Sequence, residues 1–356
     1  MSLSFPALQD CTYLNTPEQG LISQELLDYR HDLDIEISKN PKLIMFERND
    51  FINQVRKKVA SFLDVDFALT ALIPNFSFGF NTLLDIIPKD YRFLLIKGDY
   101  PSINWPVEAR GFECCYAELG KDLEKNIALA IEIHQPQVLC LSIVQYISGI
   151  KINLDFVEQL KQNYPHLIII VDATQYIGVE EFRFRESGID ILAASCYKWM
   201  HAGNGNGFMC FNERVVSRLQ PKHAPLNGTK AFENERGIFM GLFEPGHQDL
   251  SCFGSLGKAI DLINEVDLKT IQHSIKKLSL KAKNEFQKRN LLSKEVVERE
   301  IHSSIFNLKL DQHHYDKLIE KNVLCSKRGD GVRVGFHYYN TTADLNQLLN
   351  IIDHHL

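Results

Sequence analysis

Long apolar stretches are missing from this chain of 356 residues, and no run approaches the roughly 18–20 residues that a membrane-spanning helix needs. The opening MSLSFPALQD has neither a basic segment nor a long apolar core, so we expect no secretory signal. An excess of basic residues is also missing, because the formal net charge at pH 7 is -6. We therefore expect neither nucleic acid nor a membrane as a partner.

Paired cysteines and clustered metal ligands are absent as well. The eight cysteines include no C-x-x-C pair, and scattered thiols in a large chain are mostly small buried apolar groups. This pattern predicts a reducing, cytoplasmic setting. The histidine pairs at 313–314 and 354–355 have no third ligand nearby, so we expect no metal site. The glycine-rich stretch 203–207 is not followed by the G-K-[ST] of a phosphate loop.

The residues that are present describe a globular α/β protein. The composition is 45% hydrophobic and 24% charged, and the chain exceeds the ~250–300 residues at which single cores stop growing. Strand and helix patterns alternate from Phe67 to Phe211, which favours a mainly parallel sheet covered by helices on both faces. Shorter alternating pieces from Ser304 onward predict a small α+β domain. Ligands of parallel sheets bind at the carboxyl ends of the strands.

Two neighbouring strand ends carry the most informative side chains. The apolar run Ile168 to Val171 is followed by Asp172, and the run Ile189 to Ala194 leads to Lys198. A lysine amine that forms a Schiff base and an acid that pairs with the pyridine nitrogen are the two groups that pyridoxal phosphate needs. The alternative is a pair of ordinary solvated residues at strand ends. The combination favours a pyridoxal-phosphate site.

The segments VDATQ and SCYKW resemble the class V aminotransferase and cysteine desulfurase family of fold type I pyridoxal-phosphate enzymes. The resemblance implies a large domain with a mainly parallel seven-stranded sheet and a small C-terminal α+β domain. It places an N-terminal segment at 1–20, the large cofactor-binding domain at 21–265 and the small domain at 266–356. It assigns the pyridine nitrogen to Asp172, the ring hydroxyl to Gln175, the phosphate to Ser195 and the cofactor linkage to Lys198. Tyr197 stands where many members have histidine.

A second phosphate-binding element is expected where a strand passes through a tight turn into a helix, because helix N-terminal amides bind phosphate. The resemblance assigns this contact to Asn75, Phe76 and Ser77; the alternative is an ordinary connection in which Ser77 caps the helix. Family members stack an aromatic or imidazole ring on the cofactor. Tyr100 is the candidate here, with Trp105 as the alternative, and Gln145 is expected to contact the ring with its amide.

Two further segments extend the resemblance. GVRVGFHYYNT is similar to the family pattern R-x-S-x-H-x-Y-N-T, so Arg333 would clamp the substrate carboxylate, for which a guanidinium fork is well shaped. The alternative is a surface arginine on an edge strand. Phe243 to Gln248 is similar to a family turn that reaches the partner subunit's phosphate. It assigns that contact to Gly246 and His247 and implies a homodimer.

The sequence therefore predicts a pyridoxal-phosphate enzyme that acts on an amino acid through Lys198, with an aminotransferase as the first hypothesis. A carbon–sulfur or carbon–selenium lyase and an amino-acid epimerase are alternatives, and a cofactor-free scaffold is a less favoured one. Cysteine desulfurases carry a nucleophilic cysteine on a mobile loop before the substrate arginine. Cys325 instead ends an apolar strand-like run, so we expect a buried, inert thiol there. The sequence does not indicate which amino acid is the substrate.

Overall fold

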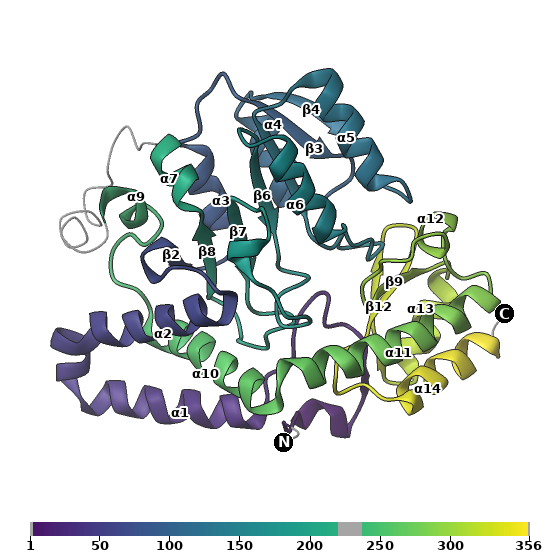
Figure 1. Ribbon diagram of the computed structural model, residues 1–356. Coiled ribbons are helices and arrows are strands. Elements are labelled where there is room, and N and C mark those ends of the chain that lie inside the picture. The colour runs from purple at the N-terminus through teal and green to yellow at the C-terminus, as the bar shows by residue number, and fades with distance from the viewer. Residues whose placement is uncertain (1–2, 220–236, 355–356) are drawn as a thin grey trace.

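A seven-stranded sheet forms the centre of the computed structural model, which describes residues 3–219 and 237–354 (Figure 1). The strand order is β2-β8-β7-β6-β5-β3-β4; β8 is antiparallel to both of its neighbours, and the other pairs are parallel. The predicted mainly parallel seven-stranded sheet is confirmed. The strands are β2 (Thr70–Ile73), β3 (Arg92–Ile96), β4 (Glu113–Ala117), β5 (Val138–Ser142), β6 (Ile168–Asp172), β7 (Ile191–Ser195) and β8 (Gly207–Phe211).

Both faces of this sheet are buried, which explains why its strands are apolar at nearly every position. In β6, Ile169 and Val171 belong to one core, whereas Ile168 and Ile170 belong to another on the opposite face. The first core includes residues of α2 (Arg48–Leu63), α5 (Leu123–His134), α6 (Leu154–Asn163) and α10 (Leu250–Val266). The second includes residues of α3 (Phe76–Leu84), α4 (Pro101–Ala109), α7 (Glu213–Arg218) and α9 (Gly237–Gly241).

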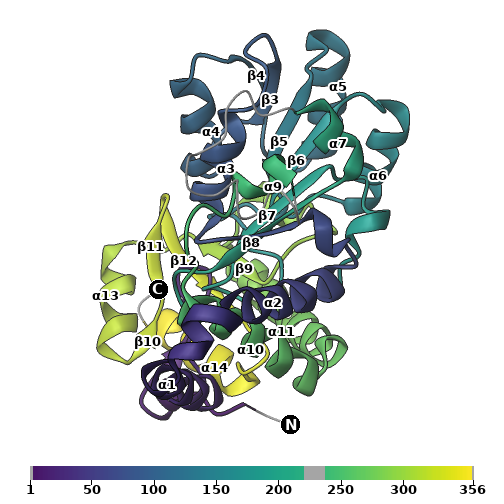
Figure 2. The same cartoon turned by 90° about the vertical axis from the view of Figure 1, so that its left-hand side faces the viewer.

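The C-terminal part forms a smaller antiparallel sheet in the order β11-β12-β9, seen in yellow and light green in Figures 1 and 2. Here α10 ends at Val266 and α11 begins at Leu268, on either side of Asp267 with φ 77°. The predicted boundary at 265/266 lies at this junction and stays a prediction. The elements are α11 (Leu268–Lys288), α12 (Lys294–Val297), β9 (Ile305–Leu308), α13 (Gln312–Glu320), β11 (Ser326–Arg328), β12 (Gly331–Gly335) and α14 (Thr342–Asp353).

The N-terminal segment lies against this C-terminal part. Strand β1 (Thr12–Tyr13) pairs in parallel with β10 (Val323–Leu324), and Gly335 N donates to Leu14 O at 2.8 Å. The chain then continues into α1 (Gln24–Lys39), which packs against α10. Residues 14–22 thus run between the two sheets. Short helical turns complete the structure at η1 (Pro6–Gln9), η2 (Leu43–Glu47), η3 (Phe67–Leu69) and η4 (Phe184–Glu186).

In the ranges 3–219 and 237–354, no helix combines the length and the apolar character that crossing a bilayer requires. Across the same two ranges, His, Cys, Asp and Glu side chains do not gather in groups of three or more that could hold a metal ion.

Candidate active site

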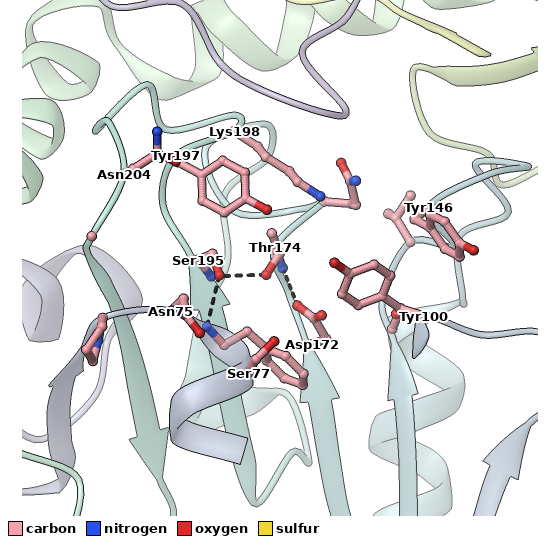
Figure 3. Close-up of a pocket in the computed structure, with 16 residues that line it drawn as sticks. Asn75, Ser77, Tyr100, Tyr146, Asp172, Thr174, Ser195, Tyr197, Lys198 and Asn204 are labelled. Carbon is pink, nitrogen blue, oxygen red and sulfur yellow. Dashed lines mark hydrogen bonds between the residues drawn. The ribbon is translucent and has the colours of Figure 1, made fainter. Parts of the chain in front are cut away.

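A cavity of about 580 Å³ lies at the carboxyl ends of the central parallel strands (Figure 3). Asp172 ends β6, Ser195 ends β7, and Lys198 follows Ser195 in the next turn. Side chains at such ends converge because parallel strands finish at the same edge of a sheet. The lining residues are Pro74, Asn75, Phe76, Ser77, Tyr100, Ser142, Val144, Tyr146, Asp172, Thr174, Gln175, Ser195, Tyr197, Lys198, Asn204 and Gly205.

Asp172 is a buried carboxylate in this cavity. Burial raises the pKa of Asp172, and the opposing influences are hydrogen bonds from Thr174 and the charge of Lys198. Thr174 N donates to Asp172 Oδ1 at 2.8 Å. A carboxylate in this environment gains most from a cationic partner, because a nearby opposite charge stabilises its ionised form. A protonated pyridine nitrogen would be such a partner.

Lys198 is a buried amine on the other side of the cavity. Its Nζ lies 5.8 Å from the centre of the Tyr100 ring and 5.6 Å from that of Tyr197. Burial lowers the pKa of Lys198; Asp172 opposes this shift and Arg333 adds to it. The lowered pKa increases the fraction of neutral amine, which is the nucleophilic form.

The N-terminal segment packs directly against the turn that carries this lysine. Gly20 N donates to Tyr197 O at 2.8 Å. A Cβ at Gly20 would lie only 2.0 Å from Lys198 O, so the backbones fit together only because residue 20 has no side chain. The position of Lys198 therefore depends on a segment that is remote in sequence.

The start of α3 forms a polar end of the cavity. Asn75 caps this helix, since its Oδ1 accepts from Phe78 N at 2.9 Å; the alternative with Ser77 as the cap is wrong. Phe76 N donates to Ser195 Oγ at 2.9 Å, which brings the helix N-terminus and the end of β7 together. Helix N-termini favour anions through their backbone amides and dipole. A phosphate group matches this end of the cavity.

The residues present fit pyridoxal phosphate. The cavity offers an amine, a buried acid and an anion-binding helix start, which match the aldehyde, the pyridine nitrogen and the phosphate of the cofactor. Tyr100 lines the cavity, whereas Trp105 is 68% exposed. Of the two aromatic candidates, Tyr100 is therefore the one placed to cover a bound ring.

Arg333 lies on β12, the central strand of the small sheet, so the alternative of an edge strand is wrong. Its Nη1 donates to Tyr146 O at 2.8 Å, and its Nη2 lies 3.7 Å from Glu18 Oε2. Nε has no hydrogen-bond partner among the described residues. Burial lowers the pKa of Arg333 to about 10, partly opposed by Glu18. A buried guanidinium with an unused N–H group is suited to an incoming carboxylate.

Four of the predicted site residues lie outside the cavity lining: Arg333, Gln145, Gly246 and His247. The Gln145 side chain is already engaged: Oε1 accepts from Ser148 N in its own loop at 2.6 Å, and Nε2 donates to Gly98 O, which follows β3, at 3.2 Å. Gly246 and His247 are exposed and do not line the cavity. Their contact with a partner subunit's phosphate stays a prediction.

Gln175 lines the cavity, but its amide already bridges two segments. Its Nε2 donates to Pro17 O at 2.8 Å, and its Oε1 accepts from Trp199 Nε1 at 2.7 Å. The amide thus ties the N-terminal segment to the lysine turn. Its assignment to the cofactor ring hydroxyl stays a prediction, and one remaining N–H would be available for that contact.

Several lining residues were not among those predicted from the sequence. Tyr146 directly follows Gln145, and its ring contacts that of Tyr100 edge-on with centres 5.1 Å apart. Thr174 lies inside the VDATQ segment, where its position two residues after Asp172 was the available signal. Asn204 and Gly205 belong to the glycine-rich stretch that lacked a phosphate-loop continuation, yet they form part of the wall.

Comparison with known proteins identifies the family. The family model described as Aminotransferase class-V matches residues 37–348. The chain is 21% identical to the uncharacterized aminotransferase YcbU of Bacillus subtilis, covering 98% of this chain and 95% of that protein. It is 23% identical to a probable cysteine desulfurase of Methanothermobacter thermautotrophicus, covering 96% and 94%.

Two further proteins resemble this chain, one over about half of its length and one over nearly all of it. An uncharacterized aminotransferase of Schizosaccharomyces pombe is 23% identical over 199 residues, which span 52% of this chain and 50% of that protein. A solved complex of the cystine C–S lyase C-DES with cysteine persulfide has a similar fold, with a TM-score of 0.81, 18% identity and coverage of 98% and 99%. The family match, which spans most of the chain, is decisive: this chain belongs to the class-V aminotransferase family of pyridoxal-phosphate-dependent enzymes of fold type I.

Proposed function

We propose that this protein is an aminotransferase that holds pyridoxal phosphate through Lys198. The observation that carries the proposal is the pairing of a buried amine with a buried acid, Asp172, on opposite sides of one cavity. When bound there, the cofactor would supply an electron sink for the charge that develops at the substrate Cα. Arg333 supports an amino acid as the substrate, because its guanidinium can fix an α-carboxylate.

Each residue then has a defined task. Arg333 orients the carboxylate, so that the bond to be broken at Cα faces Lys198 Nζ. Lys198 Nζ would accept the α-proton, and its lowered pKa suits it to this task. Asp172 would pair with a protonated pyridine nitrogen and stabilise its charge. The Tyr100 and Tyr146 rings form the wall and exclude water from one side.

Substitution of Lys198 tests the linkage. Lys198→Ala should leave a folded protein to which borohydride no longer fixes the cofactor, whereas Lys97→Ala, at an exposed lysine, should behave as wild type. Intact-mass measurement after reduction reports the result directly. If the reduced cofactor still appears on the Lys198→Ala chain, the assignment is wrong. Incubation with single amino acids and keto acids, followed by detection of the exchanged pair, tests transamination.

A carbon–sulfur lyase is the second candidate, because relatives of this chain are named as probable cysteine desulfurases. An enzyme-bound persulfide is not part of this candidate. Cys325 is only 5% exposed and burial raises its pKa to about 12, so little reactive thiolate forms. Among the described residues that line the cavity, none is a cysteine. Sulfide release from cysteine or cystine would support the lyase. Cys325→Ser should change neither the rate of sulfide release nor the rate of transamination more than about twofold. Loss of activity in that variant would restore a desulfurase role for Cys325.

We further propose a cytoplasmic homodimer. Gly246 and His247 are exposed, and Met45 and Phe46 in η2 are 70% and 74% exposed. Large exposed apolar side chains are typical of subunit contacts. The described cysteines are all free, which supports a reducing setting. A monomer in sedimentation velocity that still binds the cofactor tightly would refute the dimer.

A further inference from the structure

Glu18 places a fixed carboxylate beside the candidate carboxylate-binding arginine. Its backbone lies in a tight turn in which Glu18 N donates to Asn15 O at 2.9 Å. The neighbouring residues are tied to the large domain: Pro17 O accepts from Gln175 at 2.8 Å, and Gly20 N donates to Tyr197 O at 2.8 Å. The acid is therefore held in place by bonds on both sides of it.

The Glu18 carboxylate contacts two arginines of the small sheet. Its Oε1 lies 2.7 Å from Arg328 Nη2, and its Oε2 lies 3.7 Å from Arg333 Nη2. Asn15 Nδ2 donates to Oε2 at 3.4 Å. The first distance is that of a charge-assisted hydrogen bond, whereas the second leaves the Arg333 fork without a direct bond to this acid. Arg328 is thus the residue that Glu18 occupies, and Arg333 stays available.

The three side chains differ in their exposure to solvent, and this difference indicates different roles. Arg333 is 3% exposed, whereas Arg328 and Glu18 are 46% and 40% exposed. The buried arginine is suited to the α-carboxylate, and the outer pair lies at the solvent side of it. Both outer charges also reach the reacting amine: after burial, Asp172 and Arg333, Glu18 and Arg328 are the next influences on the pKa of Lys198. This places them within electrostatic range of anything bound at Lys198.

Charge counting then predicts which amino acids fit. Two guanidinium groups and one carboxylate leave one positive charge, which a single α-carboxylate neutralises. Because Glu18 lies beside Arg333, a second carboxylate bound on that side of Arg333 would meet Glu18, and the cation that could receive it, Arg328, is already paired. Like charges within a few ångströms of each other disfavour binding where water is partly excluded.

We propose that Glu18 is a specificity-determining residue that occupies Arg328 and thereby directs the site to amino acids with one carboxylate, at the expense of aspartate-like and glutamate-like substrates. This rests on the proposed function, because it needs the amino acid bound at Lys198 and Arg333. The substrate class it names is the monocarboxylic amino acids. In this role Glu18 affects which amino acid binds and does not take part in the proton transfer.

The test compares the dissociation constants of L-alanine and L-aspartate for the holoenzyme, measured from the change in cofactor absorbance. Glu18→Gln should shift the ratio of the two constants toward aspartate by at least about tenfold, the effect expected for removal of one nearby like charge. Adding Arg328→Gln should abolish that gain in aspartate affinity. Glu18→Gln frees the Arg328 guanidinium to bind the second carboxylate, and the double variant lacks this guanidinium. Glu18→Asp, which keeps the charge, should retain most of the wild-type preference.

The matched control is Glu320→Gln, which removes the same charge from a surface pair with Lys317 on α13. It should leave the ratio unchanged. An unchanged ratio in Glu18→Gln, an equal gain in affinity for both amino acids, or a gain that survives Arg328→Gln would each overturn the proposal. Failure of the proposed function is distinct: the wild-type protein would then show no cofactor fixed on Lys198 by borohydride and no absorbance change with either amino acid.

Discussion

Replacement of Arg56 by methionine should destabilise the fold more than any surface substitution. Arg56 of α2 pairs with Glu244, and both side chains are 0% exposed. The variant leaves the Glu244 carboxylate buried without this cation, although its Oε1 still accepts from Leu72 N at 2.6 Å. Removal of one partner from a buried ion pair costs about 3–5 kcal/mol, against a total stability of about 5–15 kcal/mol. Urea denaturation followed by circular dichroism measures this loss.

A second substitution, at Glu244, separates the effect of the buried carboxylate charge from the loss of the Arg56 side chain. In Arg56→Met/Glu244→Gln the buried carboxylate charge is gone, while the oxygen of the new side-chain amide can still accept from Leu72 N, so we expect roughly half of the loss to be recovered. The control is Lys97→Met, which breaks the Lys97–Glu118 pair with side chains 66% and 68% exposed. It should cost less than about 1 kcal/mol. If Arg56→Met also stays within about 1 kcal/mol of wild type, the reasoning on the buried charge is wrong.

Three further predictions concern the site and its pH range. Asp172→Asn should keep the cofactor linkage to Lys198 but lower kcat by about a hundredfold or more, because an amide lacks the charge that stabilises pyridinium; unchanged turnover would exclude this role. Gly20→Ala should weaken cofactor affinity by at least about tenfold, because its Cβ would lie 2.0 Å from Lys198 O. Gly111→Ala, at φ 72° with open space around it, should cost only about 1–2 kcal/mol of stability and leave affinity unchanged. Finally, burial lowers the pKa of His201 to about 4 from 6.5, so the unfolded chain binds the proton more tightly. The free energy of unfolding should therefore fall as the pH drops from 6.5 toward 4, by up to about 3 kcal/mol for this group, and His201→Asn should flatten the curve.

The parts of the site that the sequence could predict are local. Asp172 ends one strand and Lys198 follows another, and both strands are apolar at consecutive positions, so a short window contains both the element and its chemistry. The alternation of strands and helices likewise predicted the mainly parallel central sheet, because both of its faces are buried.

The parts that could not be predicted depend on side-chain direction or on distant contacts. Gln145 and Tyr146 are neighbours in one loop, and no local pattern tells which side chain faces the cavity; the hydrogen bonds of Gln145 to Gly98 and Ser148 decide it. Glu18 meets Arg328 across 310 sequence positions, a proximity that only the packing of the N-terminal segment creates. Sequence periodicity holds no information about such pairs.

The parallel pairing of β1 with β10 has a consequence for the order of biosynthesis. Thr12 and Tyr13 leave the ribosome long before Val323 and Leu324, so the early segment has to wait, unpaired, while the large domain is made. Closing so long a loop carries an entropic cost that only the finished partner strand can offset. The lysine turn, which rests on this segment at Gly20, is therefore fully assembled only late in synthesis. A nascent or prematurely terminated chain would hold the reactive lysine and yet lack the support that positions it, which would keep incomplete products from sequestering the cofactor.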